Sequence, residues 1–476
     1  MMDGVENSNN LADTINNTLS PVSDFVASII FYAVDVGGVS LPLVVVWLMV
    51  AGVVMTVSLR FINFRGFRHA VSMVFNPHDQ DGADGEISHF QALSAALSGT
   101  IGLGNIASVP IAIVIGGPGA VFWMIIAGFF GMATKFAECA MAVKYRKILP
   151  DGRSIGGPMY YIEAEFNRRG LKTIGKGVAI FFALMTIGGS ISFFQINQSH
   201  AQFANVTGIS APLTFATVMS ALVAFIALGG IKRIGLMASR LVPFMAILYL
   251  GAAIIIIALN ISSLPDVIVT IFKSAFGLEA AGGGMVGALI NGMRRATYSS
   301  EAGVGSAAIA HSAVKTNEPL TEGYVALLEP FIDTVVVCTI TALVVILTGA
   351  YEPFMYQEGA VGIQITSNAF AGTFAWFPII LLISSTLFAF TSVVSWVFYG
   401  AQAVGYLTNG SKQIDIIFKV AICVLLCASA ALSVSSILDF IDSMIFAMAI
   451  PNILVLYLML PEIKRDVKAY ELKHNI

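Results

Sequence analysis

Two short segments of the chain place several glycines and polar side chains inside long apolar stretches. They are Ser98-Gly99-Thr100-Ile101-Gly102-Leu103-Gly104-Asn105 and Tyr298-Ser299-Ser300-Glu301-Ala302-Gly303-Val304-Gly305-Ser306. Glycine in a helix interior costs about 1 kcal/mol relative to alanine, so both segments predict a break in a helix. The N–H groups freed at a break suit an anion, and the freed carbonyls suit a cation. Close helix packing through small residues is the alternative interpretation.

The composition places these segments in a membrane protein. Of the 476 residues, 57% are hydrophobic and 11% are charged, whereas soluble proteins carry roughly 25% charged residues. This excludes a soluble protein, and 25 basic against 28 acidic residues give no electrostatic case for binding nucleic acid. The four cysteines lie in apolar segments and are interpreted as buried, inert thiols.

Stretches long enough to cross a bilayer recur along the whole chain. A spanning helix needs about 20 mostly apolar residues, and about eleven stretches qualify. They lie near 40–59, 92–115, 119–143, 176–200, 210–229, 236–260, 280–310, 322–348, 374–400, 412–433 and 437–460. Residues 23–36 and 264–276 are amphipathic and are predicted to lie in the membrane interface. Most of the 25 Lys and Arg residues fall in alternate loops and in the tail, which predicts an external N-terminus and a cytoplasmic C-terminus.

The two glycine-rich segments resemble each other. Gly102-Leu103-Gly104-Asn105 and Gly303-Val304-Gly305-Ser306 share the pattern Gly-aliphatic-Gly-polar, and an odd number of predicted spans separates them. Corresponding broken helices in two inverted halves indicate the binding site of a secondary transporter. The predicted divisions are an extracytoplasmic segment 1–39, a first helix and cytoplasmic loop 40–91, inverted repeats 92–260 and 261–460, and a cytoplasmic tail 461–476.

Several longer motifs make the chain similar to a known family. Gly156-Gly157-Pro158-Met159-Tyr160-Tyr161 and Ala449-Ile450-Pro451-Asn452, with residues 116–124, 291–305, 329–334 and 387–390, resemble the signature of the alanine/glycine:cation symporter family. The resemblance covers roughly residues 40–460. It implies an all-α polytopic membrane protein of about 11 transmembrane helices in a LeuT-type 5+5 inverted repeat with two broken helices. It also implies Na⁺-coupled uptake of small neutral amino acids across the inner (plasma) membrane, without enzymatic activity.

The resemblance further implies two sets of site residues. The substrate set is Thr100, Leu103, Gly104, Asn105, Gln195, Tyr298 and Trp396. The set for Na⁺, the coupling ion, is Ser98, Ile101, Thr391 and Ser392. Three alternatives stay open: a helix–helix hydrogen bond for Gln195, back-bonding of the Thr391 and Ser392 hydroxyls, and plain packing of the two aromatic residues.

Some residues depart from the family pattern or carry charge within a span. Leu103 stands where Thr is common, Tyr298 where Phe is common, Ser300 where Asn is usual and Ser108 where Gly is usual. Lys135 and Glu138 are expected to pair with each other or to extend to the membrane surface. Glu301, Arg294 and Arg295 are expected to form a gate or ion pairs. Proton coupling, or a role as an amino-acid sensor, remains an alternative function.

Overall fold

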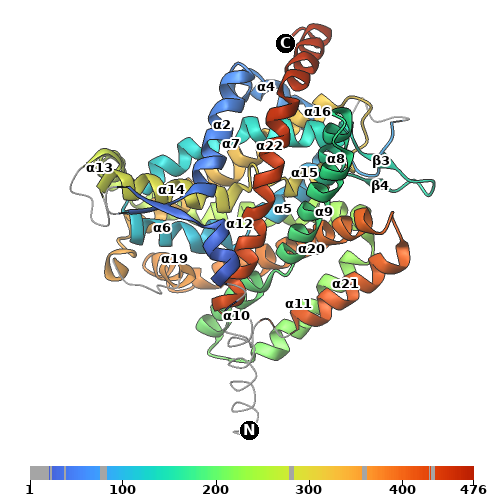
Figure 1. The fold of residues 1–476 in the computed structure, drawn as a ribbon. Helices are drawn as coiled ribbons and strands as arrows, with labels where there is room; N and C mark the ends of the chain where they lie inside the picture. The colour runs from blue at the N-terminus through green and yellow to red at the C-terminus, as the bar shows by residue number, and fades with distance from the viewer. Residues whose placement is uncertain are drawn as a thin grey trace.

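The computed structural model describes residues 21, 24–36, 39–75, 83–277, 284–355, 362–427, 429 and 435–476. Most of these residues are helical, as the sequence predicts (Figure 1). Within the described residues, six helical segments are long and apolar enough to cross a membrane, and one bent pair of helices raises the number to seven. The six are Ala120–Lys144, Lys172–Thr207, Gly230–Leu259, Pro319–Leu347, Phe377–Leu407 and Ile441–His474.

The other predicted spans also coincide with helices, but these are shorter. Leu43–Ser58 and Pro212–Ala227 are apolar helices of fewer than 18 residues. The stretch near 280–310 is helical at Gly284–Ser300 and Ser306–His311, and the stretch near 412–433 is helical at Lys412–Leu426. The total of eleven spans therefore stays a prediction.

The described N-terminal part contains a departure from an all-helical chain. Residues 24–30 are helical, and β1 (Ala33–Val36) then pairs antiparallel with β2 (Val39–Pro42), where the sequence predicted an amphipathic stretch to residue 36. The following helices are α2 (Leu43–Ser58), α3 (Ile62–Arg65) and α4 (Phe67–Phe75). A second small ribbon joins β3 (Lys147–Ile148) to β4 (Ser154–Ile155).

The first predicted break is confirmed. Helix α5 (His89–Thr100) starts with a reciprocal cap, in which Ser88 Oγ accepts from the Gln91 amide at 3.2 Å and Gln91 Oε1 accepts from the Ser88 amide at 3.1 Å. The helix ends at Thr100, and the chain resumes as the π-helix η1 (Gly104–Ser108) and α6 (Val109–Gly116). The two parts meet at 48°.

The second predicted break is confirmed as well. Helix α14 (Gly284–Ser300) ends before Glu301, and α15 (Ser306–His311) follows the gap. Glu301, Gly303 and Gly305 have φ of 51°, 93° and 90°. This left-handed backbone is easy for glycine but uncommon for a residue such as glutamate.

The remaining helices follow in chain order. From the first break to the second they are α7 (Ala120–Lys144), α8 (Pro158–Arg168), α9 (Lys172–Gly189), α10 (Phe193–Thr207), α11 (Pro212–Ala227), α12 (Gly230–Leu259), η2 (Ile261–Ser263) and α13 (Leu264–Phe276). After α15 come α16 (Pro319–Ala326), α17 (Leu328–Pro330), η3 (Phe331–Cys338), α18 (Thr339–Leu347), η4 (Glu352–Phe354), α19 (Gly362–Ala371), α20 (Phe377–Leu407), α21 (Lys412–Leu426) and α22 (Ser435–His474).

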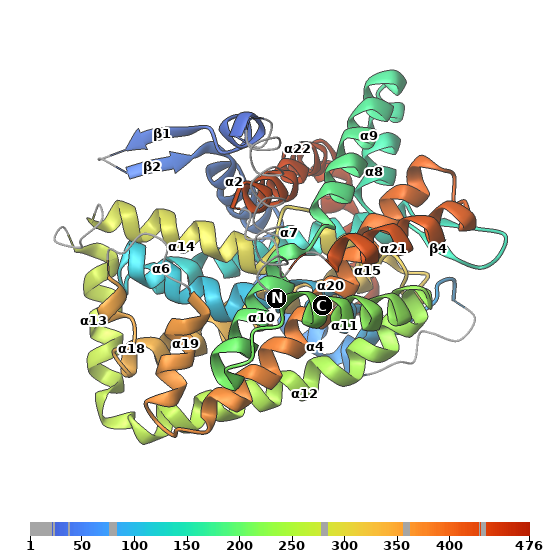
Figure 2. The ribbon, with the colours of Figure 1, turned by 90° about the horizontal axis from the view of Figure 1, so that it is seen from below.

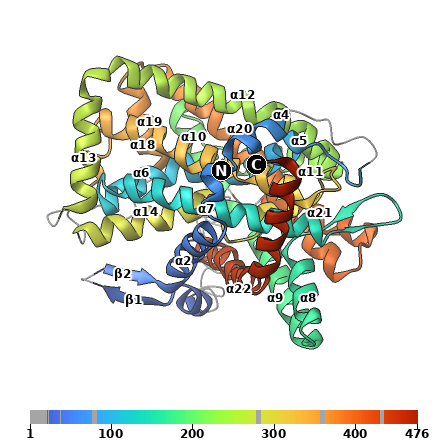
Figure 3. The same ribbon diagram turned by 90° about the horizontal axis from the view of Figure 1, so that it is seen from above.

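Helix α7 lies in the centre and contacts α2, α14, α15 and α16. Small residues on α7 allow this close packing: a Cβ on Gly128 would lie 3.0 Å from the Thr334 side chain, and one on Gly131 would lie 2.9 Å from Ala302. Figure 2 shows α6 beside α14, with α13 crossing at their outer end and α12 along one edge. Figure 3 shows α22 and α2 together on the opposite edge.

The outer helices expose large apolar side chains. Phe225 on α11, Ile247 on α12 and Val424 on α21 are each about two-thirds exposed or more, at 65%, 73% and 68%. Exposed apolar surface on this scale marks contact with an apolar medium. The chain is thus a multi-pass membrane protein whose polar side chains gather inside.

Candidate functional site

A cavity of about 270 Å³ lies where the two breaks meet α10, α20 and α22. Thr100 and Gly104 border it from the first broken helix, and Tyr298 and Glu301 border it from the second. Gln195 on α10 and Trp396 on α20 form part of the wall. The cavity therefore lies between corresponding positions of the two predicted repeats, where a transporter holds its substrate.

The first break is held open by side-chain hydrogen bonds. The Leu103 amide donates to Gln195 Oε1 at 3.1 Å, and the Gly102 amide donates to Asn105 Oδ1 at 3.1 Å. A Cβ on Gly102 would lie 2.8 Å from Ser392 Oγ and 3.1 Å from Gln195 Nε2. Only glycine fits at this point, because α10 and α20 both press their side chains against the exposed backbone.

The side-chain oxygens of the expected sodium ligands differ in whether they make hydrogen bonds within the protein. Ser392 Oγ is fully buried and has no hydrogen-bond partner among the described residues. The Thr391 hydroxyl donates to the Phe388 carbonyl at 3.2 Å, and Ser98 Oγ lies 2.6 Å from Ser395 Oγ. Buried polar atoms are rarely left without a partner. Ser392, beside the break that begins at Ile101, therefore suits a hard cation such as Na⁺.

The expected substrate residues divide into two groups. Thr100, Gly104, Gln195, Tyr298 and Trp396 border the cavity. Leu103 and Asn105 are not among its lining residues.

The contacts of Leu103 and Asn105 are with other parts of the protein. Leu103 is fully buried within the break, and its backbone amide donates to Gln195. The Asn105 side-chain amide donates to Ser299 Oγ at 3.1 Å and to Asp333 Oδ1 at 2.5 Å, which joins η1 to α14 and η3. Substrate contact by these two residues stays a prediction.

Comparison with known proteins identifies the chain. Residues 25–475 match the model of the sodium:alanine symporter family. The chain belongs to this family. Its members are symporters, which are transporters and not enzymes.

Several relatives match over nearly their whole length. The chain is 38% identical over 439 residues to the sodium/alanine symporter AgcS of Methanococcus maripaludis, covering 91% of this chain and 95% of that one. It is 32% identical to the probable sodium/glutamine symporter GlnT of Bacillus subtilis, covering 90% and 87%. The crystal structure of MhsT in complex with L-phenylalanine matches with a TM-score of 0.54 at 18% identity, covering 79% of this chain and 90% of that one. At this identity the likeness shows a shared fold.

Three charged residues of this family member also border the cavity. They are Arg295, Glu301 and Asp442. The Arg295 guanidinium lies 5.9 Å from the Tyr298 ring centroid, and the Arg294 guanidinium lies 5.7 Å from the Phe31 ring centroid. The Glu301 carboxylate accepts a hydrogen bond from Ser306 Oγ. Asp442 was not predicted, although an acidic residue inside the last apolar stretch is a signal for a functional site.

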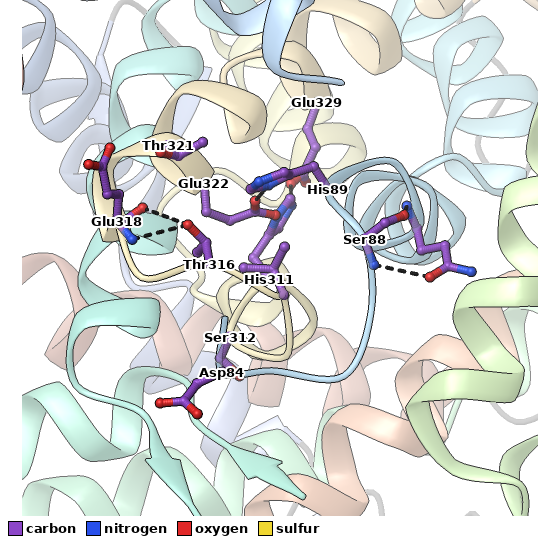
Figure 4. A network of polar contacts seen from close by, with 12 residues as sticks. Asp84, Ser88, His89, His311, Ser312, Thr316, Glu318, Thr321, Glu322 and Glu329 are labelled. Carbon is purple, nitrogen blue, oxygen red and sulfur yellow. Dashed lines mark hydrogen bonds and ion pairs between the residues drawn. The ribbon is translucent and has the colours of Figure 1, made fainter. Parts of the chain in front are cut away.

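A second polar cluster joins helices α5, α7, α15, α16 and α17 of the symporter. Figure 4 shows Glu322 on α16 reaching toward both His89 and His311, with Glu329 on the far side of His311. Lys135 Nζ on α7 lies 3.2 Å from Glu329 Oε2. All five side chains are at most 3% exposed. We call these five residues the buried ion network.

The network corrects one expectation from the sequence. Lys135 neither extends to the membrane surface nor bonds Glu138; it is fully buried and pairs with Glu329. Glu138 instead accepts from Asn452 Nδ2 at 2.5 Å. The spacing of Glu322 and Glu329, two helical turns apart and hence on one face, was the signal in the sequence for such a cluster.

Proposed function

We propose that the protein is a Na⁺-coupled symporter of small neutral amino acids that works by alternating access. The observation that carries the proposal is the unpartnered Ser392 hydroxyl, buried against Gly102 at the first break and next to the cavity. A buried oxygen with no protein partner suits a cation taken from solution. The names of two relatives, a sodium/alanine and a probable sodium/glutamine symporter, support the same coupling ion and substrate class.

In this proposal the first break binds both solutes. Ser392, Thr391, Ser98 and the Ile101 carbonyl provide oxygens for Na⁺. Gln195 uses its Oε1 to hold the Leu103 amide, which leaves its Nε2 hydrogens for the substrate carboxylate. Backbone groups around Thr100 and Gly104 complete the polar end of the site.

The aromatic residues set the size of the substrate pocket. Trp396 and Tyr298 lie on the wall of the cavity, and the Phe446 ring packs against Tyr298 at an interplanar angle of 53°, with 5.4 Å between the ring centroids. Leu103 and Asn105 act through the shape of the break. Because Tyr298 also offers a hydroxyl, it is the side chain of this set that we expect to alter the preference among neutral amino acids.

The proposed setting is the inner (plasma) membrane, with the N-terminus outside and the C-terminus in the cytoplasm. The excess of Lys and Arg in alternate loops and in the tail supports this orientation. The repeats run through residues 92–260 and 261–460. In this orientation the cavity lies toward the outside and the buried ion network lies toward the cytoplasm.

Uptake into proteoliposomes tests the proposal. Radiolabelled alanine, glycine and glutamine are offered to vesicles with an inward Na⁺ gradient, with an inward proton gradient, and with neither. We expect uphill uptake in the Na⁺ arm alone, increased by a negative interior, because one charge crossing 100 mV supplies about 2.3 kcal/mol. Equal uptake in the proton arm would replace Na⁺ with H⁺, and binding without uphill uptake would indicate a sensor.

A further inference from the structure

His311 lies between two carboxylates in the buried ion network. Its Nδ1 lies 2.5 Å from Glu322 Oε1, and its Nε2 contacts Glu329. The other oxygen of Glu322 contacts Nδ1 of His89 (Figure 4). The side chains of His311, Glu322 and Glu329 are each at most 1% exposed, so water does not replace any of these contacts.

This geometry fixes the number of protons that the cluster must hold. A neutral imidazole donates from one ring nitrogen only, and an ionised carboxylate only accepts. With a carboxylate on each side, a neutral His311 would set a nitrogen lone pair against a carboxylate oxygen. One additional proton, on His311 or on a facing carboxyl, turns both contacts into hydrogen bonds.

The same proton balances the charge of the cluster. Glu322 and Glu329 bring two negative charges, and the Lys135 ammonium, 3.2 Å from Glu329, brings one positive charge. His89 satisfies its contact with Glu322 as a neutral donor. The extra proton therefore makes the four-residue set of Lys135, His311, Glu322 and Glu329 neutral, whereas its loss leaves an unpaired buried negative charge, which is costly.

The surroundings of His311 contain few other ionisable groups. His89 faces it from α5, Glu322 from α16 and Glu329 from α17, and α7 contributes Lys135, Glu138 and Cys139. Helix α20 contributes Tyr399, and Glu301 lies on its own segment beyond the break. Arg146 donates to the carbonyls of Ser312, at 3.0 Å, and Thr316, at 2.8 Å, just beyond α15.

We propose that His311, Glu322 and Glu329 form a proton-binding site, separate from the substrate cavity, whose proton holds this side of the protein closed. The site joins α5, which leads into the first break, to α15, which leaves the second, and to α16 and α17. Opening this side must part these helices. The inference requires only such an opening and is independent of which ion drives transport.

The proton step is a simple dissociation. When the helices part, one N–H bond of the His311 imidazolium breaks, the electron pair stays on the nitrogen, and water accepts the proton. A water-exposed imidazole is mostly neutral above about pH 7. The closed form therefore holds one proton more than the open form. While the closed site stays protonated and the exposed imidazole is neutral, each unit of rising pH favours the open form by about tenfold.

A metal ion is the competing occupant. Ligand atoms of Cys139, His311 and Glu329 all lie within 4.8 Å of one another. The ammonium of Lys135 beside Glu329 opposes a second cation there, and the existing His311–Glu329 contact would have to break. The observations thus favour a proton, and a chelator separates the two cases.

Alkylation of a reporter cysteine tests the proposal on the full-length protein in nanodiscs, without any need for transport. Ser312→Cys places a thiol next to His311 at a position that is 1% exposed. Its alkylation rate by a maleimide is measured by mass spectrometry between pH 7 and 9. The rate is divided by that of the same reporter in the His311→Gln background, which cancels the pH dependence of the thiol.

We expect this ratio to rise by about tenfold per pH unit. If His311→Gln does not fold, Glu322→Gln replaces it as the reference background. This variant removes one carboxylate but keeps a hydrogen-bonding side chain, and it should likewise abolish the pH effect. His200→Gln, which changes a buried histidine on α10 outside the network, should keep it. A ratio that does not change with pH would overturn the proposal. So would a pH effect that disappears on adding a chelator, because it would assign the groups to a metal ion.

Discussion

The cavity and the buried ion network use their polar groups in opposite ways. Around the cavity, Ser392 Oγ, Tyr298 Oη and Arg295 Nε have no hydrogen-bond partner within the described part of the chain. In the network, His311 and Glu322 each bind two neighbours, and Lys135 Nζ and Glu329 Oε2, which make no hydrogen bond among the described residues, form an ion pair at 3.2 Å. Buried polar groups normally find a partner. The comparison indicates that partners for the first region come from solution, whereas the second region fastens helices to one another.

Lys135→Met is expected to have the largest effect, because it breaks the network from within. It leaves Glu329 buried without the ammonium that now lies at 3.2 Å. Removing one member of a buried pair typically destabilises a protein by about 3–5 kcal/mol. Thermal unfolding in detergent would measure the change.

Two variants serve as controls for this prediction. Lys176→Met removes an exposed lysine from α9 and should cost about 1 kcal/mol or less. Adding Glu329→Gln to Lys135→Met should recover part of the loss. If Lys135→Met unfolds at the native temperature, the ion pair contributes little and the contrast with the cavity disappears.

Gly102→Ala should be the most damaging change on the cavity side. The new methyl group would lie 2.8 Å from Ser392 Oγ and 3.1 Å from Gln195 Nε2, and must displace one of them. Overpacking of this kind costs about 1–3 kcal/mol, so we expect uptake to fall by about tenfold or more. Gly251→Ala on α12 is the matched control, because a Cβ there has no neighbour within 4 Å. Native uptake by Gly102→Ala would place the ion and the substrate elsewhere.

Ser392→Ala sharpens the comparison, since it removes an oxygen that no described residue uses. The loss of a bond to a charged partner costs about 1.5–3 kcal/mol. We therefore expect the Na⁺ concentration for half-maximal uptake to rise by about tenfold or more, with folding unchanged. Ser385→Ala, on the same helix but bonded to the Leu382 carbonyl at 3.1 Å, should leave it unchanged. The same Na⁺ dependence in both variants would return Ser392 to a packing role.

Tyr298→Phe should have the smallest effect. Its hydroxyl is buried without a partner in the described structure, so its removal costs no internal hydrogen bond. We expect nearly native stability and a shift toward alanine and glycine of about fivefold or less, as one neutral hydrogen bond permits. A competition panel of amino acids would measure the preference. Unchanged ranking would exclude the hydroxyl from substrate contact.

The sequence predicts local features well because helix breaks depend on neighbouring residues. Glycines among polar side chains in an apolar stretch indicate both breaks directly. The resemblance adds Gln195 and Ser392, whose roles in binding stay predictions. The sequence does not predict that the Leu103 side chain lies outside the cavity lining. A non-helical segment has no regular period from which to infer the direction of a side chain. Nor does the sequence predict the contact of His89 with Glu322, because 233 residues separate them. Such pairs depend on how distant helices pack.

The length of α22 has a consequence outside the membrane. Its 40 residues span about 60 Å, roughly twice the thickness of the hydrocarbon core. Near its end, Glu471 binds Arg65 at 2.9 Å, Tyr470 binds His69 at 2.9 Å, and His474 binds Glu318 at 2.9 Å. The end of α22 thus connects α3 and α4 with the start of α16, beyond the hydrocarbon core. A fluorophore on this end would record in the aqueous phase when α4 and α16 change their relative position.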